Sequence, residues 1–505
     1  MKYECKYSIK DNFLENLLKE RGIENVEEYL HPTERDLCNP YDLDNINEAA
    51  NLLIEKLENK NSKICMIVDC DCDGYTSSAM LWNYIKEQYS EVNLSYKIHS
   101  GKQHGLEDMI DVIENSEGKI DLLILADSSS NDYEYHQRLK NMNIPVIVLD
   151  HHEADKYSEN AIVVNNQLSQ KYPNKYLSGA GVVYKFLQVL DDKLGIQEAD
   201  EYLDLAAIGI VGDMMSMIPL ENRYIISKGP ENIKNPSIKE IINKQAYSIK
   251  DTSHITPMVV SFYIAPLINA IIRVGRESEK ETFFLSLVDG NRMVPKISRG
   301  KVVEGQFESL AEQNARNCVN ARGRQNRAKE KAIEQLEMKI IKNGLDENKI
   351  IFVAIDNEDI DSTLTGLVAM QLMAKYKKPV IVARENDEGF LRGSARGDNK
   401  SELKDLRQFF IDSGYFEYAE GHAAAHGISI EKSKLDGFIN YANKALENVN
   451  FNEGVYEADF VFKADESEEI AKVILDLTQY PEIWSKDNEE PLIVIENIRL
   501  TKDDI

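Results

Sequence analysis

The feature that most constrains the fold is a series of short apolar segments between residues 63 and 165, separated by segments with helical spacing. Val, Ile and Leu fill these apolar segments almost without interruption, which is typical of parallel strands buried on both faces. The helical connections predict βαβ units and therefore a parallel sheet. Sheets of this kind bind ligands at the carboxyl ends of their strands, where the connecting loops meet. The polar residues of those loops are therefore the first candidates for a functional site.

Three of the apolar segments end in aspartate. The acidic loops that follow contain Asp69, Asp71 and Asp73, then Asp127, and then Asp150 with His151 and His152. Carboxylates gathered in one crevice repel one another strongly unless cations lie between them. Carboxylates combined with imidazoles suit Mn²⁺ or Mg²⁺ better than thiol-preferring metals. The three loops together therefore predict a divalent-metal site.

Each loop taken alone also has a simpler interpretation. One aspartate after a strand is most often a turn or helix-capping residue, and two adjacent histidines are often solvated. An EF-hand calcium loop is excluded because its twelfth position, counted from Asp69, is Met80, and because a strand precedes it. Cys70 and Cys72 are interpreted as small loop residues. The metal site rests on the combination of the three loops.

The length of 505 residues predicts several domains. A mostly helical stretch is expected from about 178 to 345, ending in a long charged helix, and strand–helix alternation restarts after it. The expected parts are an N-terminal helical segment 1–60, a catalytic domain 61–300, a connecting helix 301–345, a second α/β domain 346–450 and a C-terminal segment 451–505.

Four sequence motifs carry a specific resemblance. VDCDCDGYTSS, LADSSSND, VLDHHE and AAIGIVGDMMSMIPLENR follow, in order, the four motifs of the DHH phosphoesterase superfamily. The detailed match is to the RecJ family of 5′→3′ single-strand exonucleases and covers nearly the whole chain; GLVAMQLMAKYKKPVIVAR, LRGSARG and GHAAAHG resemble its DHHA1 domain. The resemblance implies a two-lobed α/β fold in which a long helix joins a parallel-sheet DHH domain to a smaller DHHA1 domain.

The same resemblance implies the residues of a two-metal site. The implied Mn²⁺ or Mg²⁺ ligands are Asp69, Asp71, Asp73, Asp127, Asp150, His151 and Asp213. The implied catalytic residues are Asp71, Asp73, Asp127, His151, His152 and Asp213. Two metals in such a site activate a water and stabilise the charge that develops on the phosphoryl group.

The chain departs from the family pattern at three places. Many members carry a histidine where this chain has Ile67, so that one metal ligand is missing unless Asp69 substitutes for it. The glycine that often follows the second-motif aspartate is replaced by Ser128–Ser130, and Leu267 occupies a position where arginine is usual. These changes are expected to affect the metal affinity and the rate of hydrolysis more than the type of reaction.

Residues that would hold a nucleic-acid strand also follow from the resemblance. They are Asn269, Arg273, Arg276, Arg324, Ser394, Arg396, Gly421 and His422. Ser394 and Arg396 are expected near a terminal phosphate, and Gly421 is expected to let the backbone approach a ligand closely. His426 has no counterpart in the motif and is expected to be structural.

The charge distribution fits a nuclease with an acidic exterior. The net charge is −27, yet the stretch from Arg292 to Lys331 has ten Lys or Arg against four Glu. This stretch is expected to line a basic channel for single-stranded nucleic acid, with DNA favoured, and a separate single-strand-binding protein is a further expected partner. No apolar run was expected to approach the roughly 18 residues of a membrane span, and a reducing cytoplasm fits the six scattered cysteines.

The C-terminal segment 451–505 resembles the approach to an OB-type barrel, and the barrel itself is expected to be missing. Two other functions remain open from the sequence. One is a phosphodiesterase for short oligonucleotides or cyclic dinucleotides, and the other is a degenerate, non-catalytic RecJ-like binding subunit. The departure at Ile67 keeps the second open, and the evidence against it is retention of Asp71, Asp73, Asp127, His151 and Asp213.

Overall fold

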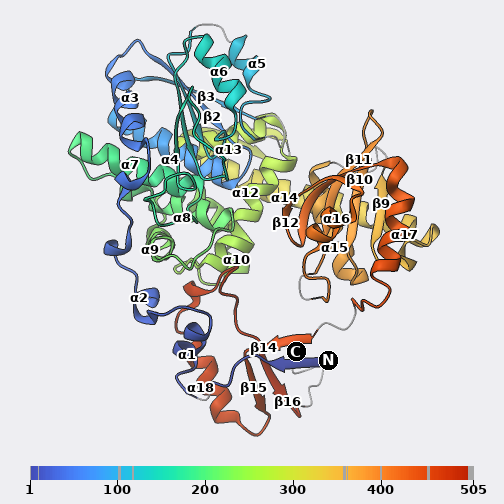
Figure 1. Cartoon of the computed structure of the whole chain (residues 1–505). Helices are drawn as coiled ribbons and strands as arrows, with labels where there is room; N and C mark the ends of the chain where they lie inside the picture. Colours follow the sequence, from blue (N-terminus) through green and yellow to red (C-terminus); the bar gives the residue numbers. More distant parts are fainter. Residues whose placement is uncertain are drawn as a thin grey trace. The chain divides into compact units, whose positions relative to one another are not determined.

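The computed structural model describes residues 2–9, 11–99, 104–115, 119–298, 300–355, 360, 362–398, 401–451 and 455–498. The chain forms two compact units. The larger unit comprises Ile9–Arg322 and Glu468–Glu490, and the smaller unit comprises Met1–Ser8, Gly323–Ser467 and Pro491–Ile505. Figure 1 shows the elements of each unit.

A five-stranded parallel sheet forms the centre of the larger unit, in the order β3-β2-β4-β5-β6. Its strands are β2 (Lys63–Val68), β3 (Asn93–Ile98), β4 (Leu122–Ala126), β5 (Val146–Asp150) and β6 (Ile162–Asn165). All residues of β4 and β5 are buried, as expected for a parallel sheet covered on both faces. The predicted α/β fold class is confirmed, and the apolar segments between residues 63 and 165 form the strands of the predicted parallel sheet.

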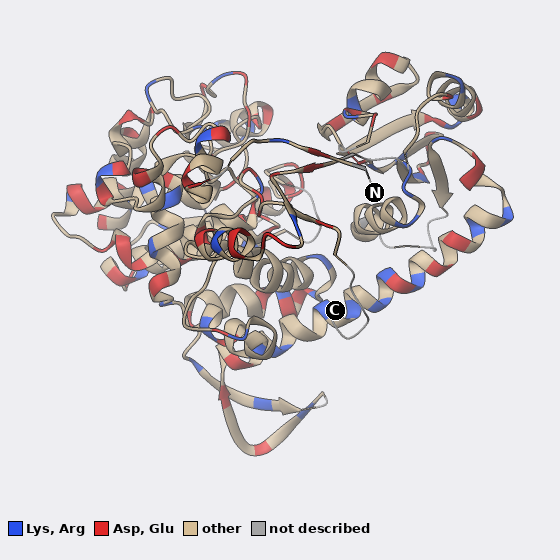
Figure 2. Ribbon diagram, turned by 90° about the horizontal axis from the view of Figure 1, so that it is seen from below, with Lys and Arg blue, Asp and Glu red and all other residues tan. Residues whose placement is uncertain are grey.

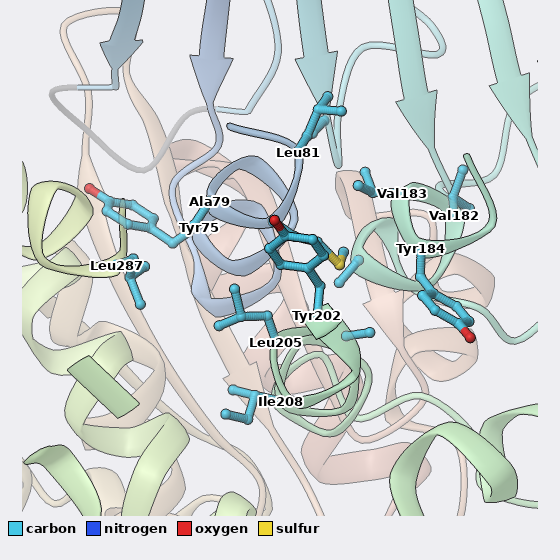
Figure 3. Close-up of a cluster of buried hydrophobic side chains, with 14 of the residues drawn as sticks. Tyr75, Ala79, Leu81, Val182, Val183, Tyr184, Tyr202, Leu205, Ile208 and Leu287 are labelled. Atoms are coloured by element: carbon cyan, nitrogen blue, oxygen red, sulfur yellow. The ribbon is translucent and has the colours of Figure 1, made fainter. Parts of the chain in front are cut away.

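Alternate residues of each strand face two different layers of helices. One face packs with α3 (Ile46–Glu58), α4 (Cys72–Gln88) and α7 (Gly179–Leu194). The other face packs with α5 (Ile110–Glu114) and α6 (Tyr133–Asn141). Helix α8 (Leu203–Gly212) is buried almost throughout, and Figure 3 shows its side chains Leu205 and Ile208 beneath those of α4 and α7. This packing fixes the ends of α4, α7 and α8 beside the carboxyl edge of the sheet.

The remaining helices of the larger unit surround this core. They are α1 (Phe13–Glu20), α2 (Val26–Leu30), α9 (Leu220–Lys228), α10 (Pro236–Ile249), α11 (Pro257–Val259), α12 (Ala265–Val274), α13 (Glu277–Val288) and α18 (Ser467–Leu477), whose first residue is assigned to the smaller unit. Short 3₁₀ turns lie at Glu34–Asp36, Pro40–Asp42, Ala199–Tyr202, Gly229–Asn232 and Pro481–Ile483, and a π-helical turn lies at Val260–Ile264.

The expectation that no apolar run reaches membrane-spanning length was wrong. The stretch Pro257–Val274, which covers α11, the π-helical turn and α12, has a mean hydropathy of 1.6 over 18 residues. Half of it is buried within the larger unit, where Ile264 and Ile268 have no exposed surface. A core helix has the same length and composition, so this stretch is weak evidence for a membrane span.

The region from 178 to 345 is less uniformly helical than the sequence predicted. Strands β7 (Met293–Ser298) and β8 (Lys301–Ser309) form an antiparallel hairpin. The expected connecting helix 301–345 is therefore wrong over its first nine residues, which form β8. Helix α14 runs from Leu310 to Lys342, and Gly344 follows it with a left-handed φ of 61°. Figure 2 shows Lys and Arg distributed along this helix.

The smaller unit contains a mixed five-stranded sheet in the order β12-β13-β11-β10-β9. Its strands are β9 (Ile351–Ile355), β10 (Val380–Glu385), β11 (Phe390–Arg396), β12 (Phe416–His422) and β13 (Ala425–Glu431). Only β9 and β10 are parallel. The helices are α15 (Thr365–Tyr376), α16 (Leu406–Ser413) and α17 (Leu435–Ala445), with 3₁₀ turns at Leu345–Glu347, Ser362–Leu364 and Lys432–Lys434. This arrangement confirms a second α/β part.

Two small parallel pairings complete the smaller unit. Strand β1 (Lys2–Cys5) pairs with β14 (Val455–Ala458), and β15 (Phe460–Lys463) pairs with β16 (Ile493–Glu496). The hydroxyl of Tyr3 also donates a hydrogen bond to Glu496. The described residues of the segment 451–505 contain strands and helix α18, and the pairing of β14 with the N-terminal strand was not predicted.

Candidate active site

The carboxyl ends of β2, β4 and β5 bring the three acidic loops to one edge of the sheet in the larger unit. Potential ligand atoms of Asp69, Asp71 and Asp127 lie within 4.8 Å of one another. A second such group contains Asp73, His151 and Asp213, and a third contains Asp127, His151 and His152. The structure therefore brings together the residues that the sequence predicted from four separate motifs.

The first acidic loop is held by backbone donors of two helices. Asp71 caps α4 by accepting a hydrogen bond of 2.9 Å from the backbone amide of Gly74. Asp73 is buried and accepts hydrogen bonds from the Ser178 hydroxyl at 2.8 Å and from the Gly179 amide at 2.6 Å. The amino end of α7 thus faces this carboxylate, and the positive end of its helix dipole favours the charge.

The second loop adopts an unusual backbone. Asp127 has a φ of 72°, and Ser129 has a φ of 82°, in the left-handed region that glycine occupies at little cost. Family members often place glycine in this loop, where it adopts a left-handed φ without strain. In this chain the non-glycine residues Asp127 and Ser129 adopt that conformation instead. Such strain persists where surrounding contacts determine the loop conformation, as at functional sites. The Asp127 amide donates to the Leu149 carbonyl at 2.8 Å and anchors the loop on β5.

Asp150 organises the third loop from a fully buried position. Its Oδ1 accepts hydrogen bonds from the His151 amide at 2.7 Å and from His152 Nδ1 at 2.8 Å, and its Oδ2 accepts one from the Ser130 amide at 2.9 Å. Its own oxygens are therefore occupied, and Asp150 belongs to none of the ligand groups given above for the described residues, which fits a supporting residue better than a metal ligand. Although burial opposes ionisation, the hydrogen bond and charge of His152 hold the pKa of Asp150 below its usual range.

His151 joins two of the acidic elements. Its Nε2 lies 3.2 Å from Oδ1 of Asp127 and 3.5 Å from Oδ2 of Asp213. Asp213 follows the last turn of α8, so it reaches the site from an element other than the three strand-end loops. The side chain of His152, in contrast, is half exposed.

The concentration of carboxylates makes the site electrostatically unfavourable without cations. Burial, followed by the charges of Asp73 and Asp71, raises the pKa of Asp213 to about 8. Burial and the same neighbours raise the pKa of Asp127 well above its usual range. Burial lowers the pKa of His151, which favours the neutral imidazole that can bind a metal. Oδ1 of both Asp69 and Asp127 is buried without a hydrogen-bond partner among the described residues.

These observations fit one or more divalent cations. Oxygen atoms dominate the cluster, and a neutral imidazole completes it, as expected for Mn²⁺ or Mg²⁺. The buried oxygens that lack a hydrogen-bond partner are those that a cation would satisfy. Asp69, Asp71, Asp73, Asp127, His151 and Asp213 can hold such ions.

Two further imidazoles lie at the first loop and were missed in the sequence. His104 Nδ1 lies 2.5 Å from Oδ2 of Asp69, and His99 Nε2 lies 3.9 Å from Oδ1 of the same residue. His99 directly follows β3, the neighbour of β2 in the sheet. The end of β3 reaches the same sheet edge, and that signal was available in the sequence, since a histidine follows the apolar run VNLSYKI.

A group of basic side chains in the larger unit lies near the acidic cluster. Burial lowers the pKa of Arg273, and the negative charge of Asp71 acts in the opposite direction. Burial and the charge of Arg273 also lower the pKa of Arg322, so the two guanidinium groups lie within electrostatic range of each other. Asn269 is half-buried on α12, whereas Arg276 is exposed and its backbone caps α13.

The other predicted strand-binding residues belong to the smaller unit. Ser394 and Arg396 lie on β11, where the Ser394 hydroxyl is 3.1 Å from that of Thr365 on α15. Gly421 has a φ of 126° at the end of β12, next to the exposed His422. Arg324 lies on α14. Each of these residues remains a predicted substrate contact. His426 is buried and packs edge-on against Phe410 at 5.2 Å, consistent with a structural residue.

The sequence is similar to known proteins along almost its entire length. Residues 63–210 match the DHH family, N-terminal domain. A single-strand DNA-specific exonuclease named YorK, derived from the SPbeta prophage of Bacillus subtilis strain 168, is 38% identical over 97% of this chain and 84% of its own length. The single-stranded-DNA-specific exonuclease RecJ of the same organism is 25% identical over 88% of this chain and 53% of its own length.

The fold is also similar to solved structures. RecJ from Thermus thermophilus in complex with Mn²⁺ superposes with a TM-score of 0.68 at 21% identity, covering 96% of this chain and 67% of that chain. A manganese-bound exonuclease RecJ superposes with a TM-score of 0.58 at 22% identity, covering 80% of this chain and 95% of that chain. With the shared DHH motifs and the extended similarity to YorK, these results show that the chain belongs to the RecJ-type exonuclease family of DHH proteins.

Proposed function

We propose that this protein is a metal-dependent exonuclease that hydrolyses the phosphodiester bonds of single-stranded DNA in the 5′→3′ direction. The observation that carries the proposal is the convergence of Asp71, Asp73, Asp127, His151 and Asp213 at one edge of the parallel sheet. The names of its relatives support single-stranded DNA as the substrate. DNA recombination, repair or replication in the cytoplasm is the corresponding context, with a single-strand-binding protein as a candidate partner.

Within the site, the carboxylates and His151 would hold Mn²⁺ or Mg²⁺, in a two-metal arrangement by resemblance to the family. When bound, the metals supply a water activated for attack on phosphorus and stabilise the oxyanions of the reacting group. Asp127 lies between the Asp69–Asp71 group and His151, so it is the candidate for a bridging ligand. Asp73 is held rigidly by the α7 backbone, which preorganises its position.

The remaining residues would orient the strand and handle protons. Asp150 fixes the ring of His152 through Nδ1, and although burial opposes ionisation, this carboxylate raises the pKa of His152 to about 9. The imidazolium form can therefore donate a hydrogen bond from Nε2 to a phosphate or leaving oxygen. Arg273 and Arg322 would provide guanidinium groups for phosphate contacts on the metal-binding side. Ser394, Arg396, Gly421 and His422 would contact phosphate and sugar from the smaller unit. Asn269 and Arg276 are assigned the same role.

The test is degradation of single-stranded DNA labelled at either its 5′ or its 3′ end, followed on a gel with Mn²⁺, with Mg²⁺ and with EDTA. Early release of the 5′ label as mononucleotide supports the proposed polarity, and early release of the 3′ label contradicts it. The same assay is run on alternative substrates, which are duplex DNA, single-stranded RNA, dinucleotides and cyclic dinucleotides. An Asp127→Ala variant controls for contaminating nuclease, and no metal-dependent turnover on any substrate would favour the non-catalytic alternative.

A further inference from the structure

A histidine outside the four motifs, His104, lies directly against the first acidic loop. Its Nδ1 is 2.5 Å from Oδ2 of Asp69, and its Nε2 is 3.9 Å from the sulfur of Cys70. Asp69, Cys70 and His104 each place one potential ligand atom within 4.8 Å of the others. His104 comes from the connection between β3 and α5, which contributes none of the predicted site residues.

The residues after His104 are attached to the second acidic loop. The backbone amide of Leu106 donates a hydrogen bond of 2.8 Å to Oδ2 of Asp132, and the Leu106 side chain is fully buried. Gly105 has a φ of 79°, and a Cβ atom at this position would lie 2.5 Å from the same Asp132 oxygen. Only glycine fits this close approach without strain. His104 is therefore positioned by the fold at the edge of the acidic cluster.

A second imidazole gives independent evidence that this side of the cluster is built for a ligand. His99 is 2% exposed, and neither of its ring nitrogens has a hydrogen-bond partner among the described residues. Its Nε2 points toward Asp69 Oδ1 at 3.9 Å, and that oxygen is also buried without a partner. Burial of unsatisfied polar atoms is costly, so a group that satisfies Asp69 is expected here.

The strand that precedes Asp69 offers no nitrogen donor of its own. Ile67 on β2 is fully buried and packs with Leu125 and Leu139 in the apolar layer beneath α5 and α6. Its side chain therefore serves the core. An imidazole for this part of the cluster has to come from another element, and the imidazoles of His99 and His104 both approach Asp69.

We propose that His104 is an imidazole ligand of a metal ion held on Asp69, and that His99 is a positioning residue beside Asp69. This inference rests on the proposed metal-dependent function and names a ligand that the family motifs do not include. A nitrogen donor in an oxygen-rich site favours Mn²⁺ over Mg²⁺, because Mg²⁺ prefers oxygen ligands and keeps its waters. The site would then select Mn²⁺ through His104.

The experiment compares the wild type with His104→Ala and with His254→Ala, in which the exposed His254, outside all of these clusters, is the matched control. Mn²⁺ and Mg²⁺ binding is measured by isothermal titration calorimetry on the metal-free full-length protein. Pulsed electron paramagnetic resonance on the Mn²⁺-loaded samples then records the couplings of directly bound imidazole nitrogens. Circular dichroism and the thermal unfolding midpoint establish that each variant is folded.

We expect His104→Ala to weaken one Mn²⁺-binding step by about tenfold or more and to change Mg²⁺ binding less. It should also remove one class of imidazole nitrogen coupling, while that of His151 and the behaviour of His254→Ala stay unchanged. Unaltered nitrogen couplings and unaltered Mn²⁺ affinity in a folded His104→Ala variant would overturn the assignment and leave the proposed nuclease function standing. Failure of the wild type to bind Mn²⁺ or Mg²⁺ would instead contradict both.

Discussion

Gly179 at the start of α7 packs directly against Asp127: a Cβ atom at position 179 would lie 2.5 Å from both Cβ and Oδ1 of Asp127. The amide of the same glycine donates to Asp73 at 2.6 Å. One residue therefore sets the spacing of two acidic loops. A methyl group there would displace either the α7 backbone or the candidate bridging carboxylate, and both belong to the site.

We predict that Gly179→Ala strongly reduces both Mn²⁺ affinity and hydrolysis, because the backbone of Asp127 lies too close for the new methyl group to be accommodated. The matched control is Gly323→Ala, since the nearest atom to a Cβ at position 323 in α14 is an Arg327 nitrogen at 3.4 Å. That control should be neutral or slightly stabilising, by up to about 1 kcal/mol. Calorimetric metal binding and steady-state turnover of the two folded variants check the prediction. Equal activity of both would refute the spacing role of Gly179.

We predict that Asp127→Ala abolishes hydrolysis and leaves the fold intact. The carboxylate is central to the acidic cluster, and its removal relieves repulsion from Asp73 and Asp71 when no metal is bound. The thermal midpoint in EDTA should therefore equal or exceed that of the wild type, while Mn²⁺ should stabilise the variant less. Differential scanning fluorimetry and a single-strand degradation assay measure the two effects. Mn²⁺-dependent turnover in the purified variant would contradict the site assignment.

We predict that Arg396→Ala raises KM for single-stranded DNA by about tenfold or more with little change in kcat. Loss of a charge-assisted phosphate contact costs about 1.5–3 kcal/mol of binding energy, and a contact made equally in ground and transition states affects KM alone. Arg392, an exposed neighbour on the same strand that approaches Glu388, provides the control variant Arg392→Ala. A loss confined to kcat would show that Arg396 acts on the transition state instead.

The features that the sequence predicted best are those with a regular or local residue pattern. The five strands of the larger unit were identified because uninterrupted Val, Ile and Leu runs such as β4 and β5 have few other stable placements. The rule that parallel strands end at one edge then placed Asp71, Asp127 and His151 together. Pairing between distant segments was not predicted, as for β1 with β14, because four-residue strands have little pattern of their own.

Two other features that the sequence did not predict, the β7–β8 hairpin and the position of His104, also have specific causes. The β7–β8 hairpin contains charged residues and exposed apolar ones such as Val302 and Phe307, so it shows no buried face in its sequence pattern. His104 was overlooked because its role depends on a backbone turn at Gly105 and on a contact with Asp132, 27 residues further along the chain. Contacts of that kind follow from tertiary packing and have no local signature.

We predict a pH dependence of stability that originates in His136 on α6. Burial lowers the pKa of this histidine to about 4, and neither ring nitrogen has a partner among the described residues. An unfolded histidine has a pKa of about 6.5, so the unfolded chain binds the proton more readily. Neutral His136 therefore makes its full contribution to the free energy of unfolding above about pH 6.5. This contribution, about 3 kcal/mol in total, is lost as the pH falls toward about 4.

Urea unfolding of the metal-free protein between about pH 7.5 and 4 measures this effect against a His136→Leu variant. The variant should lose less stability on acidification than the wild type, whereas His254→Leu, at an exposed position, should follow the wild type. Parallel curves for wild type and His136→Leu would assign the acid sensitivity to other groups.

The last prediction concerns which arginines of α14 contact the strand. Arg316 forms a two-pronged ion pair with Glu308 of β8, at 2.7 and 2.6 Å, and that partner is nearly buried. Its guanidinium group is therefore committed to holding the hairpin against the helix. We expect Arg324 to contact phosphate instead, since each phosphate neutralised on a single strand contributes about −0.7 to the slope of log K against log salt.

Fluorescence anisotropy with an Asp127→Ala background and Ca²⁺ in place of Mn²⁺ measures binding to oligonucleotides at increasing salt. Adding Arg324→Ala should make the slope shallower by about 0.7, whereas adding Arg316→Ala should leave the slope unchanged and lower the unfolding midpoint. Oligonucleotides of increasing length should reach a constant slope once they fill the binding surface. An equal change of slope for both variants would show that the Glu308 ion pair opens to release Arg316, and that the hairpin takes part in binding.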